Sequence, residues 1–317
     1  MADHRRKFLA LAGAALALSL CSRVTAAQDI VVIATDTLTS TQRSIGGEKS
    51  VIKSQNPAAV FHEFLFQPGA GRDPVVKDSV LKLKPRLVLT VGSAATQYAR
   101  DNFPDIPTVF CSVMYPVISG FVETFSHPGG NITGASLSIP ADIQFRYFKQ
   151  IIPTLKTLGV LYTDNTAPLI PPSKVVAKQM GLNLVAIKIS SEKELSASLD
   201  SIAKVADGIW SVADANLFNP QSTKFILVNA LRKGIPLMGF SRNVVESGAL
   251  FALDFDYKAI GRQAGDLANQ VMKGARTQEL PVTTPDIIWF HYNEKTAQHM
   301  NITIPPELVT IAKEVYR

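Results

Sequence analysis

Polar side chains follow most of the apolar, strand-like runs of this 317-residue chain, at the point where each run ends. In a parallel α/β sheet those ends meet at one edge, where helix N-termini also present free N–H groups. Carboxylates, hydroxyls and amides gathered there can hold a small organic molecule without covalent chemistry. The sequence therefore predicts ligand contacts at Asp36, Ser93, Ala95, Thr96, Ser112, Tyr115, Asn165, Asp214, Ser241 and Asp254.

Some of these residues have a purely structural alternative. The turn Gly92-Ser93-Ala94-Ala95-Thr96 opens a helix and could offer hydroxyls and backbone donors to a carboxylate, but Ser93 could also be an ordinary N-cap. Tyr115 could provide a flat apolar wall with a hydroxyl, although a Tyr-Pro turn often serves only packing. Asp254 could hold a ligand ammonium, whereas Asp256 suits a helix cap better.

The chemistry expected of an α/β enzyme is missing from the sequence. It contains no G-x-x-x-x-G-K-[ST], G-x-G-x-x-G, G-x-S-x-G or H-E-x-x-H motif. The histidines that follow the leader are scattered without metal-ligand spacing, and Cys111 adjoins an apolar run, as a buried structural thiol does. We therefore predict neither catalysis nor a cofactor nor a metal.

Apolar runs alternate with helical patterns from about Asp29 onward, which predicts an α/β fold. The runs are apolar on both faces, as buried parallel strands are. They fall into two series, which predicts two doubly wound lobes with parallel sheets. The first series is 30–33, 60–66, 87–91 and 108–110; the second is 158–162, 184–187, 208–210 and 236–240.

Helix boundaries are marked by capping residues and by proline or glycine. Ser191 and Glu194 form a capping box ahead of a helix, and Pro153 ends an apolar stripe that begins near Ile143. Asp256 is predicted to cap a helix that ends just before Gly274. These stripes read as ordinary core.

The first 26 residues resemble a secretory signal. A basic segment, Arg5-Arg6-Lys7, precedes an apolar run and the small-residue cleavage site Val24-Thr25-Ala26. The paired arginines also fit the twin-arginine route, which stays open beside general export. Cys21 raises the alternative of lipid attachment, although Leu20 before it is larger than the residue usually found there. Residues 1–26 are therefore predicted to be a cleaved signal peptide, and the mature protein to lie in the periplasm.

Charge and cysteine content narrow the partners. The leader holds four basic residues and one acidic residue, so its removal lowers the formal net charge from +6 to +3. The high isoelectric point is then weak support for nucleic-acid binding, and no nucleic-acid partner is expected. Cys111 is the single cysteine after the leader, which leaves no intrachain disulfide.

The C-terminal third carries the strongest family resemblance. Its segments are Gly234-Ile235-Pro236, Glu246-Ser247-Gly248-Ala249-Leu250, Asp256-Tyr257, Ile260-Gly261-Arg262-Gln263-Ala264, Leu280-Pro281-Val282 and Ile304-Pro305-Pro306-Glu307-Leu308. With Gly92–Thr96 and Asn131-Ile132-Thr133-Gly134, they make residues 85–315 resemble the ABC-transporter substrate-binding proteins often associated with uptake of tryptophan or other aromatic amino acids.

That resemblance implies a type I periplasmic-binding fold, in which two similar lobes joined by three hinge strands bury the ligand when they close. It implies ligand contacts at Ser93 and Thr96, after Phe110, and near Asn165 and Asp214. The predicted N-terminal lobe comprises 27–135 plus 254–282, and the C-terminal lobe 136–253 plus 283–317. The stretch from 34 to 66 departs from the family pattern, so the ligand's identity stays open.

The function predicted from the sequence is capture of a small organic ligand, such as an amino acid or similar carboxylate, in the periplasm. The expected partners are that ligand and an ABC permease in the inner membrane, and the protein is expected to be a monomer. A ligand-sensing module for a membrane receptor or two-component system is the main alternative. An α/β enzyme is the less favoured third.

Overall fold

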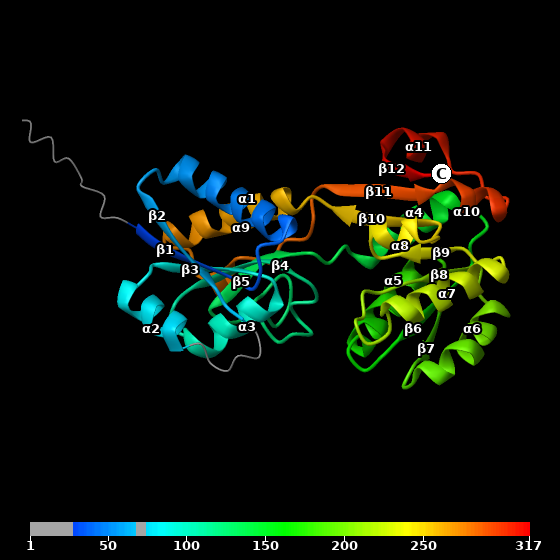
Figure 1. Ribbon diagram of the computed structural model, residues 1–317, viewed down its shortest axis with the longest axis horizontal. Coiled ribbons are helices and arrows are strands. Elements are labelled where there is room, and N and C mark those ends of the chain that lie inside the picture. The colour runs from blue at the N-terminus through cyan, green and yellow to red at the C-terminus, as the bar shows by residue number, and fades with distance from the viewer. Residues whose placement is uncertain (1–27, 68–73) are drawn as a thin grey trace, which may run out of the picture.

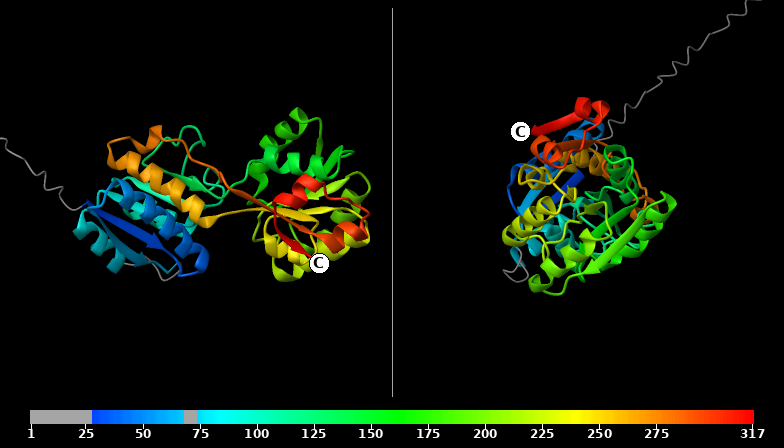
Figure 2. Two further views of the ribbon diagram at one scale, coloured as in Figure 1. Left: turned by 90° about the horizontal axis from the view of Figure 1, so that it is seen from above. Right: turned by 90° about the vertical axis from the view of Figure 1, so that its right-hand side faces the viewer.

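The computed structural model describes residues 28–67 and 74–317, which form two lobes joined by a narrow neck (Figures 1 and 2). The predicted signal peptide lies outside these residues. The predicted strands correspond to β1–β4 and β6–β9. Within the described ranges, no helix has the length and apolarity needed to span a bilayer.

The first lobe is a five-stranded parallel sheet in the order β2-β1-β3-β4-β5. Helices α1 and α9 cover one face, and α2 and α3 cover the other. Its elements are β1 (Gln28–Ala34), α1 (Thr39–Gln55), β2 (Ala59–Leu65), α2 (Pro74–Leu83), β3 (Leu87–Val91), α3 (Ser93–Asn102), β4 (Thr108–Val113), β5 (Ile132–Ser136), α9 (Tyr257–Met272) and the 3₁₀ turn Thr277–Glu279.

The second lobe is built on a seven-stranded sheet in the order β12-β11-β10-β9-β8-β6-β7. Its first elements are α4 (Ala141–Ile151), β6 (Thr157–Tyr162), the 3₁₀ turn Ala167–Leu169, α5 (Ile170–Gln179), β7 (Asn183–Lys188), the 3₁₀ turn Glu192–Glu194, α6 (Leu195–Ala203) and β8 (Gly208–Trp210). The others are α7 (Pro220–Arg232), β9 (Leu237–Gly239), α8 (Arg242–Glu246), β10 (Phe251–Phe255), β11 (Ile288–Asn293), α10 (Glu294–His299), α11 (Pro306–Ile311) and β12 (Ala312–Tyr316).

Two apolar layers hold the second sheet. Phe145, Phe148 and Ile151 of α4 pack on one face beside α5, while α6, α7 and α8 pack on the other. The same side chains explain why the pattern around Ile143 predicts a helix. The most deeply buried residues of α4 are Phe145 and Phe148, whereas Ile143 is partly exposed.

The strands that connect the lobes differ most from the prediction. The prediction of three hinge strands does not place β10 and β11 in the second sheet, where they pair antiparallel rather than parallel, and it lacks β12. The physical reason is topological: β10 leads out to the first lobe and β11 returns from it, so the two must run in opposite directions. Asp254 therefore belongs to the second sheet, and the chain passes into the first lobe after Phe255.

Three short segments cross between the lobes, 137–140, Asp256 and 284–287. The first and third lie side by side: the Ser136 amide donates to Thr283 O at 2.9 Å, and the Thr283 amide donates to Gly134 O at 3.0 Å. Asp256 caps α9 as predicted, accepting from the Lys258 amide at 2.8 Å.

The predicted capping box is only partly correct. The side chain of Ser191 accepts from the Lys193 amide, but Glu194 accepts from the amide of Ser190 rather than that of Ser191. The reason is a 3₁₀ turn over Glu192–Glu194 that precedes α6 and shifts the cap.

Helices α1 and α9 lie closely packed because glycines occupy their contact. A β-carbon at Gly261 would collide with the carbonyl of Ser44, and one at Gly47 with that of Lys258. Beside this contact Glu48 is fully buried, and neither of its carboxyl oxygens has a hydrogen-bond partner. Burial raises the pKa of Glu48 well above its ordinary value of 4.5, so the neutral acid is favoured.

This buried carboxyl predicts an unusual pH dependence of stability. Because the folded pKa of Glu48 is raised, its contribution is fully present below the unfolded value near 4.5 and is lost as the pH rises toward the folded pKa. We expect Glu48→Gln to flatten that dependence. Glu48→Met, which removes the unpaired carboxyl, should raise the free energy of unfolding at neutral pH.

Urea unfolding at mildly acidic and mildly alkaline pH measures both effects. Glu307→Gln, which alters an exposed carboxyl on α11, is the matched control. A Glu48→Gln variant whose stability follows the wild-type pH profile would contradict the assignment.

Candidate functional site

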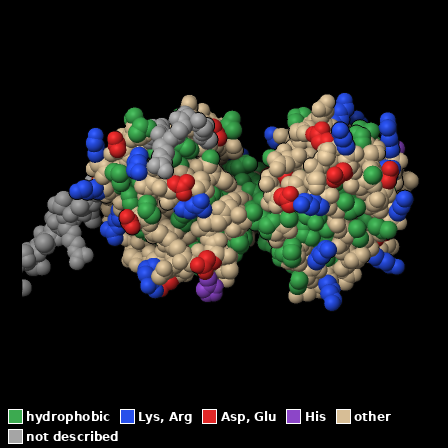
Figure 3. All heavy atoms as spheres, turned by 90° about the horizontal axis from the view of Figure 1, so that it is seen from below, with side chains coloured by type: hydrophobic (Ala, Val, Ile, Leu, Met, Phe, Trp, Pro, Cys, Tyr) green, Lys and Arg blue, Asp and Glu red, His purple; other side chains and the backbone are tan. Residues whose placement is uncertain are grey.

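A cavity of about 500 Å³ lies between the lobes and receives lining residues from both. Tyr115, Val117 and Phe125 come from the first lobe, and Trp210 and Phe240 from the second. Hydrophobic side chains border the groove between the two lobes, whereas charged side chains are scattered over the outer surfaces (Figure 3). The walls are therefore suited to an apolar or aromatic group.

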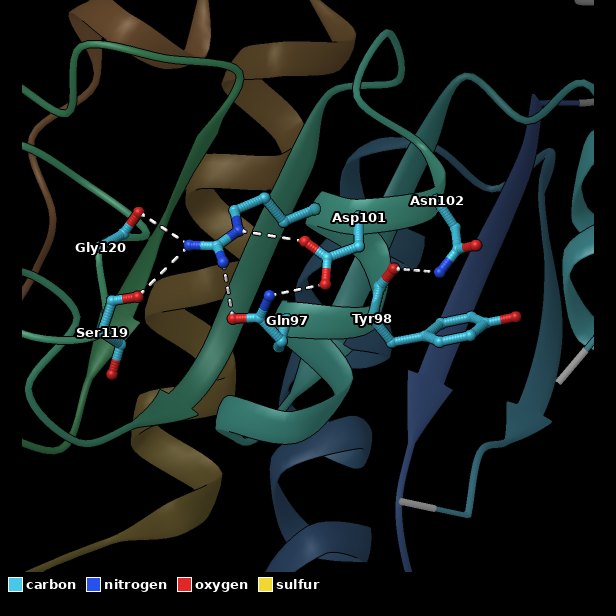
Figure 4. Close-up of polar contacts among 7 residues, drawn as sticks. Gln97, Tyr98, Asp101, Asn102, Ser119 and Gly120 are labelled. Atoms are coloured by element: carbon cyan, nitrogen blue, oxygen red, sulfur yellow. Dashed lines mark hydrogen bonds and ion pairs between the residues drawn. The ribbon is translucent and has the colours of Figure 1, made fainter. Parts of the chain in front are cut away.

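The first-lobe wall is a loop after β4 that α3 holds in place. Arg100 of α3 donates to the carbonyls of Ser119 and Gly120, at 3.3 and 3.1 Å (Figure 4). Its guanidinium has two further contacts: it donates to Gln97 Oε1 at 2.9 Å and lies over the Phe121 ring at 5.5 Å from its centroid. The loop is thus fixed at its far end by a residue outside the cavity.

The near end of the loop has a strained backbone. Ser112 and Tyr115 have φ of 59° and 53°, in the left-handed region that non-glycine residues rarely adopt. The pairing of β4 with β5 also shifts register between Cys111 and Val113. Such conformations cost on the order of 1–3 kcal/mol each, and they persist where surrounding contacts enforce them.

Tyr115 is held by contacts from both lobes. Its amide donates to Ser138 Oγ at 3.2 Å, and its phenol oxygen accepts from the Ala213 amide of the second lobe at 3.1 Å. Burial raises the pKa of Tyr115 to about 12, so the phenol is neutral at physiological pH and its hydroxyl can still donate.

The second-lobe wall is fixed by a chain of side-chain hydrogen bonds. Trp210 Nε1 donates to Gln144 Oε1 at 2.7 Å, and Gln144 Nε2 donates to Ile139 O at 2.7 Å. The Trp210 ring meets Phe145 edge-on with centroids 5.1 Å apart, and Phe240 meets Phe218 at 5.0 Å. These contacts orient the aromatic rings without a ligand.

The cavity offers little chemistry beyond shape and apolar surface. Among its lining residues, Asp142 carries the one charge, and its carboxylate pairs with Arg146 at 3.2 Å. Within the described ranges, no group of three or more His, Cys, Asp or Glu residues could hold a metal ion. The arrangement is built for binding.

Of the predicted contact residues, Tyr115 lines this cavity and the others have different surroundings. Asp36 accepts from the Leu38 amide at 2.9 Å and from Thr41 Oγ1 at 2.6 Å, which fixes the start of α1. These hydrogen bonds lower the pKa of Asp36. Ser112 lies within β4, which is longer than predicted, and its hydroxyl meets that of Ser44 at 2.9 Å.

In the predicted turn at Gly92, the side chain of Ser93 is exposed, whereas those of Ala95 and Thr96 are buried. Ser93 is exposed, and the alternative prediction that it caps α3 is wrong, because Gly92 holds the N-cap position and no side-chain cap bond forms. Ala95 and Thr96 are fully buried. Thr96 Oγ1 donates to Gly92 O at 2.9 Å and meets Thr90 Oγ1 at 2.9 Å, so it faces the lobe interior.

Asp214 is the centre of a buried network in the second lobe. Its Oδ2 accepts from Thr163 Oγ1 at 2.8 Å and from Thr166 Oγ1 at 2.6 Å, and its Oδ1 accepts from the Asn216 amide at 3.0 Å. The carboxylate therefore joins the loops after β6 and β8 rather than facing the cavity. Asn165, in the same β6 loop, is exposed.

The two remaining candidates lie beside the hinge. Asp254 pairs in register with Trp289, while its neighbours Leu253 and Phe255 line the cavity. Because side chains alternate along a strand, Asp254 points to the opposite face of β10. Ser241 precedes α8 without a side-chain cap bond.

The cavity residues absent from the prediction are mostly apolar. Trp210, Phe240 and Phe255 lie at or near the ends of β8, β9 and β10. The signal was present, since Trp210 and Phe240 end runs that were predicted as strands. The prediction rests mainly on polar residues after each run, whereas these cavity residues are aromatic and lie at or near the strand ends.

Comparison with known families identifies the chain. Residues 76–316 match the family described as ABC transporter substrate binding protein. The chain belongs to this family. Its members bind substrates for transport and typically act outside the cytoplasm.

A curated relative and two solved structures resemble this substrate-binding protein. The relative is a tyrosine-binding protein of Clostridioides difficile (strain R20291), 28% identical over 222 residues, which are 69% of this chain and 64% of the relative. The chain thus spans slightly less than two thirds of that relative's length.

Both structures support the type I periplasmic-binding fold. One is a ligand-free, open substrate-binding protein with adhesive properties from Clostridium difficile, with a TM-score of 0.75 and 20% identity, covering 91% of this chain and 99% of the other. The second is an ABC domain in complex with L-Trp from Streptococcus pneumoniae, with a TM-score of 0.65 and 22% identity, covering 90% and 99%.

The network around Asp214 predicts that this residue supports stability. Asp214→Ala leaves the hydroxyls of Thr163 and Thr166 without their acceptor, so we expect the free energy of unfolding to fall by about 3 kcal/mol. Asp164→Ala is the control, because Asp164 is an exposed neighbour that pairs with Lys188. Urea unfolding measures the difference. Unchanged stability together with lost ligand affinity would instead favour a ligand contact.

Proposed function

We propose that this substrate-binding protein captures an aromatic amino acid between its lobes and delivers it to an ABC permease in the inner membrane. The observation that carries the proposal is the interlobe cavity, whose walls are aromatic and whose lining holds a single charged residue. Its volume of about 500 Å³ suits a ligand of this size. The tyrosine and L-Trp named for the two relatives add support.

The ring of the ligand is proposed to occupy the space between Tyr115 on one lobe and Trp210 and Phe240 on the other. Offset or edge-on contacts with these rings favour an aromatic group beyond the gain from burying its area. The first turn of α4 borders the same cavity, and its N-cap residue Pro140 supplies no side-chain cap. We assign the polar end of the ligand to this turn, whose N–H groups suit its carboxylate and whose Asp142 carboxylate suits its ammonium.

Closure follows from where the contacts come from. A ligand that touches Tyr115 and Phe240 together gains both sets of contacts only when the lobes approach each other, so binding stabilises the closed arrangement. Each lobe has its own sheet and core, and three short segments join them. The movement is therefore proposed to be close to rigid-body, with backbone rotation confined to the crossings.

Residues 1–26 are proposed to direct export to the periplasm, where the mature protein meets its ligand and acts as a monomer. The order of basic, apolar and small residues supports this leader assignment. The twin-arginine and general routes both fit its sequence.

The ligand class is tested by calorimetry on protein stripped of copurified ligand by mild denaturation. We expect L-Trp, L-Tyr or L-Phe to bind, and L-Leu, L-Glu and ribose to bind far more weakly. Phe240→Ala should weaken binding of the aromatic ligand by roughly 10- to 100-fold, because a buried aromatic contact is lost. Phe225→Ala removes a partly exposed ring on α7 and should leave affinity unchanged. Tight binding of a sugar, with no aromatic amino acid bound, would overturn the proposal.

Export is tested by N-terminal sequencing of protein from the periplasmic fraction. We expect the mature chain to begin near Ala26 or Ala27, because the small-residue site ends there. Replacing both Arg5 and Arg6 with Lys should block export only on the twin-arginine route. A product that keeps Met1 and stays in the cytoplasm would contradict the leader assignment.

A further inference from the structure

Tyr115 connects the two lobes at the edge of the cavity without any ligand. Its phenol oxygen accepts a hydrogen bond from the Ala213 amide, and both residues line the cavity. The contact lies outside the three crossing segments, so it adds a link between the lobes, as the Arg43 guanidinium over the Trp289 ring does elsewhere. Because it occurs beside the aromatic walls, it bears directly on how the cavity opens.

On the first lobe this link is attached to a rigid support. Tyr115 has a left-handed backbone and donates its amide to Ser138 Oγ at 3.2 Å. Further along the loop, Arg100 donates hydrogen bonds to the carbonyls of Ser119 and Gly120 (Figure 4). The loop is thus held on both sides of Val117, at Ser138 of the first crossing and at Arg100 of α3.

On the second lobe the partner is equally constrained. Ala213 directly precedes Asp214, whose buried carboxylate binds the hydroxyls of Thr163 and Thr166. On the N-terminal side, Ser211 and Val212 connect β8 to Ala213, and both are buried. The amide that Tyr115 accepts from is therefore part of the lobe core and moves only when the lobe moves.

The position of the link in the strand order defines what it can do. Tyr115 follows β4, the neighbour of β5, from which the first crossing leaves. Ser93 follows β3, one strand further from that crossing, and Asn165 follows β6, beyond β8 in the second sheet. A rotation about a point near Tyr115 displaces these outer residues more than it displaces the cavity walls.

We propose that the Tyr115–Ala213 hydrogen bond is a pivot that holds the cavity side of the lobes together while the outer side opens and closes. The cavity walls then move less than the outer residues between the open and closed arrangements, and the ligand enters from the outer side. The pivot rests on the proposed clamp function, but it can be tested without a ligand. Tyr115 acts in this role as a positioning residue, in addition to any contact with the ligand.

The test uses the full mature chain as wild type, Tyr115→Phe and Tyr147→Phe. Tyr115→Phe keeps the ring and removes the acceptor, whereas Tyr147→Phe removes a hydroxyl from an α4 residue outside the cavity lining. In the ligand-free protein we expect Tyr115→Phe to speed hydrogen exchange of the Ala213 amide at least about tenfold, because its hydrogen-bond acceptor is gone. Small-angle scattering should show a larger radius of gyration, and Tyr147→Phe should match wild type in both.

Ligand binding supplies a separate readout. Affinity for whichever aromatic amino acid binds wild type should fall by about 2- to 10-fold in Tyr115→Phe, the loss expected for one neutral hydrogen bond. Unchanged Ala213 exchange and unchanged scattering in Tyr115→Phe would overturn the pivot. If no aromatic amino acid binds wild type, the proposed ligand fails, while the two ligand-free measurements still decide the pivot.

Discussion

The packing of α9 against α1 is the interaction on which the two-lobed arrangement depends. α9 follows β10 of the second lobe in the chain, yet its inner face, including Ile260, Ala264 and Leu267, belongs to the core of the first lobe. Gly261 allows the two helices to approach to backbone contact. This helix lies in the first lobe, and the chain must then return to the second lobe. β10 therefore leads to one crossing and β11 follows the next, so these two neighbouring strands run antiparallel.

The cavity follows from that same crossing. β10 and the crossing segment 137–140 both reach the neck. Their apolar residues Leu253, Phe255 and Ile139 line the space between the lobes. Polar groups nearby are used to fix the walls. Gln144 orients Trp210, Ser138 holds Tyr115, and Arg100 secures the loop beyond it. An aromatic surface that is set in advance reduces the ordering cost of binding a rigid ring.

The polar residues predicted as ligand contacts show why strand ends alone are an incomplete guide. Polar side chains cluster there for two reasons, because ligands bind there and because loops at strand ends need their backbone groups satisfied. Asp36 and Asp214 serve the second need, since each accepts several hydrogen bonds from its own lobe. Thr96 bonds within its own turn. Tyr115 differs from them, because it lines the cavity while its backbone amide and its hydroxyl are held by hydrogen bonds.

The fold class, the two series of strands, the cap at Asp256 and the family can be predicted from the sequence, because they depend on local periodicity and on motifs in a fixed order. Which side chains meet across the lobes cannot be predicted in this way. The antiparallel β10–β11 pair, the outward face of Asp254 and the contact between Tyr115 and Ala213 all depend on long-range pairing. A strand's pattern shows that it is buried, but its direction and its neighbours are set by where the chain must go next.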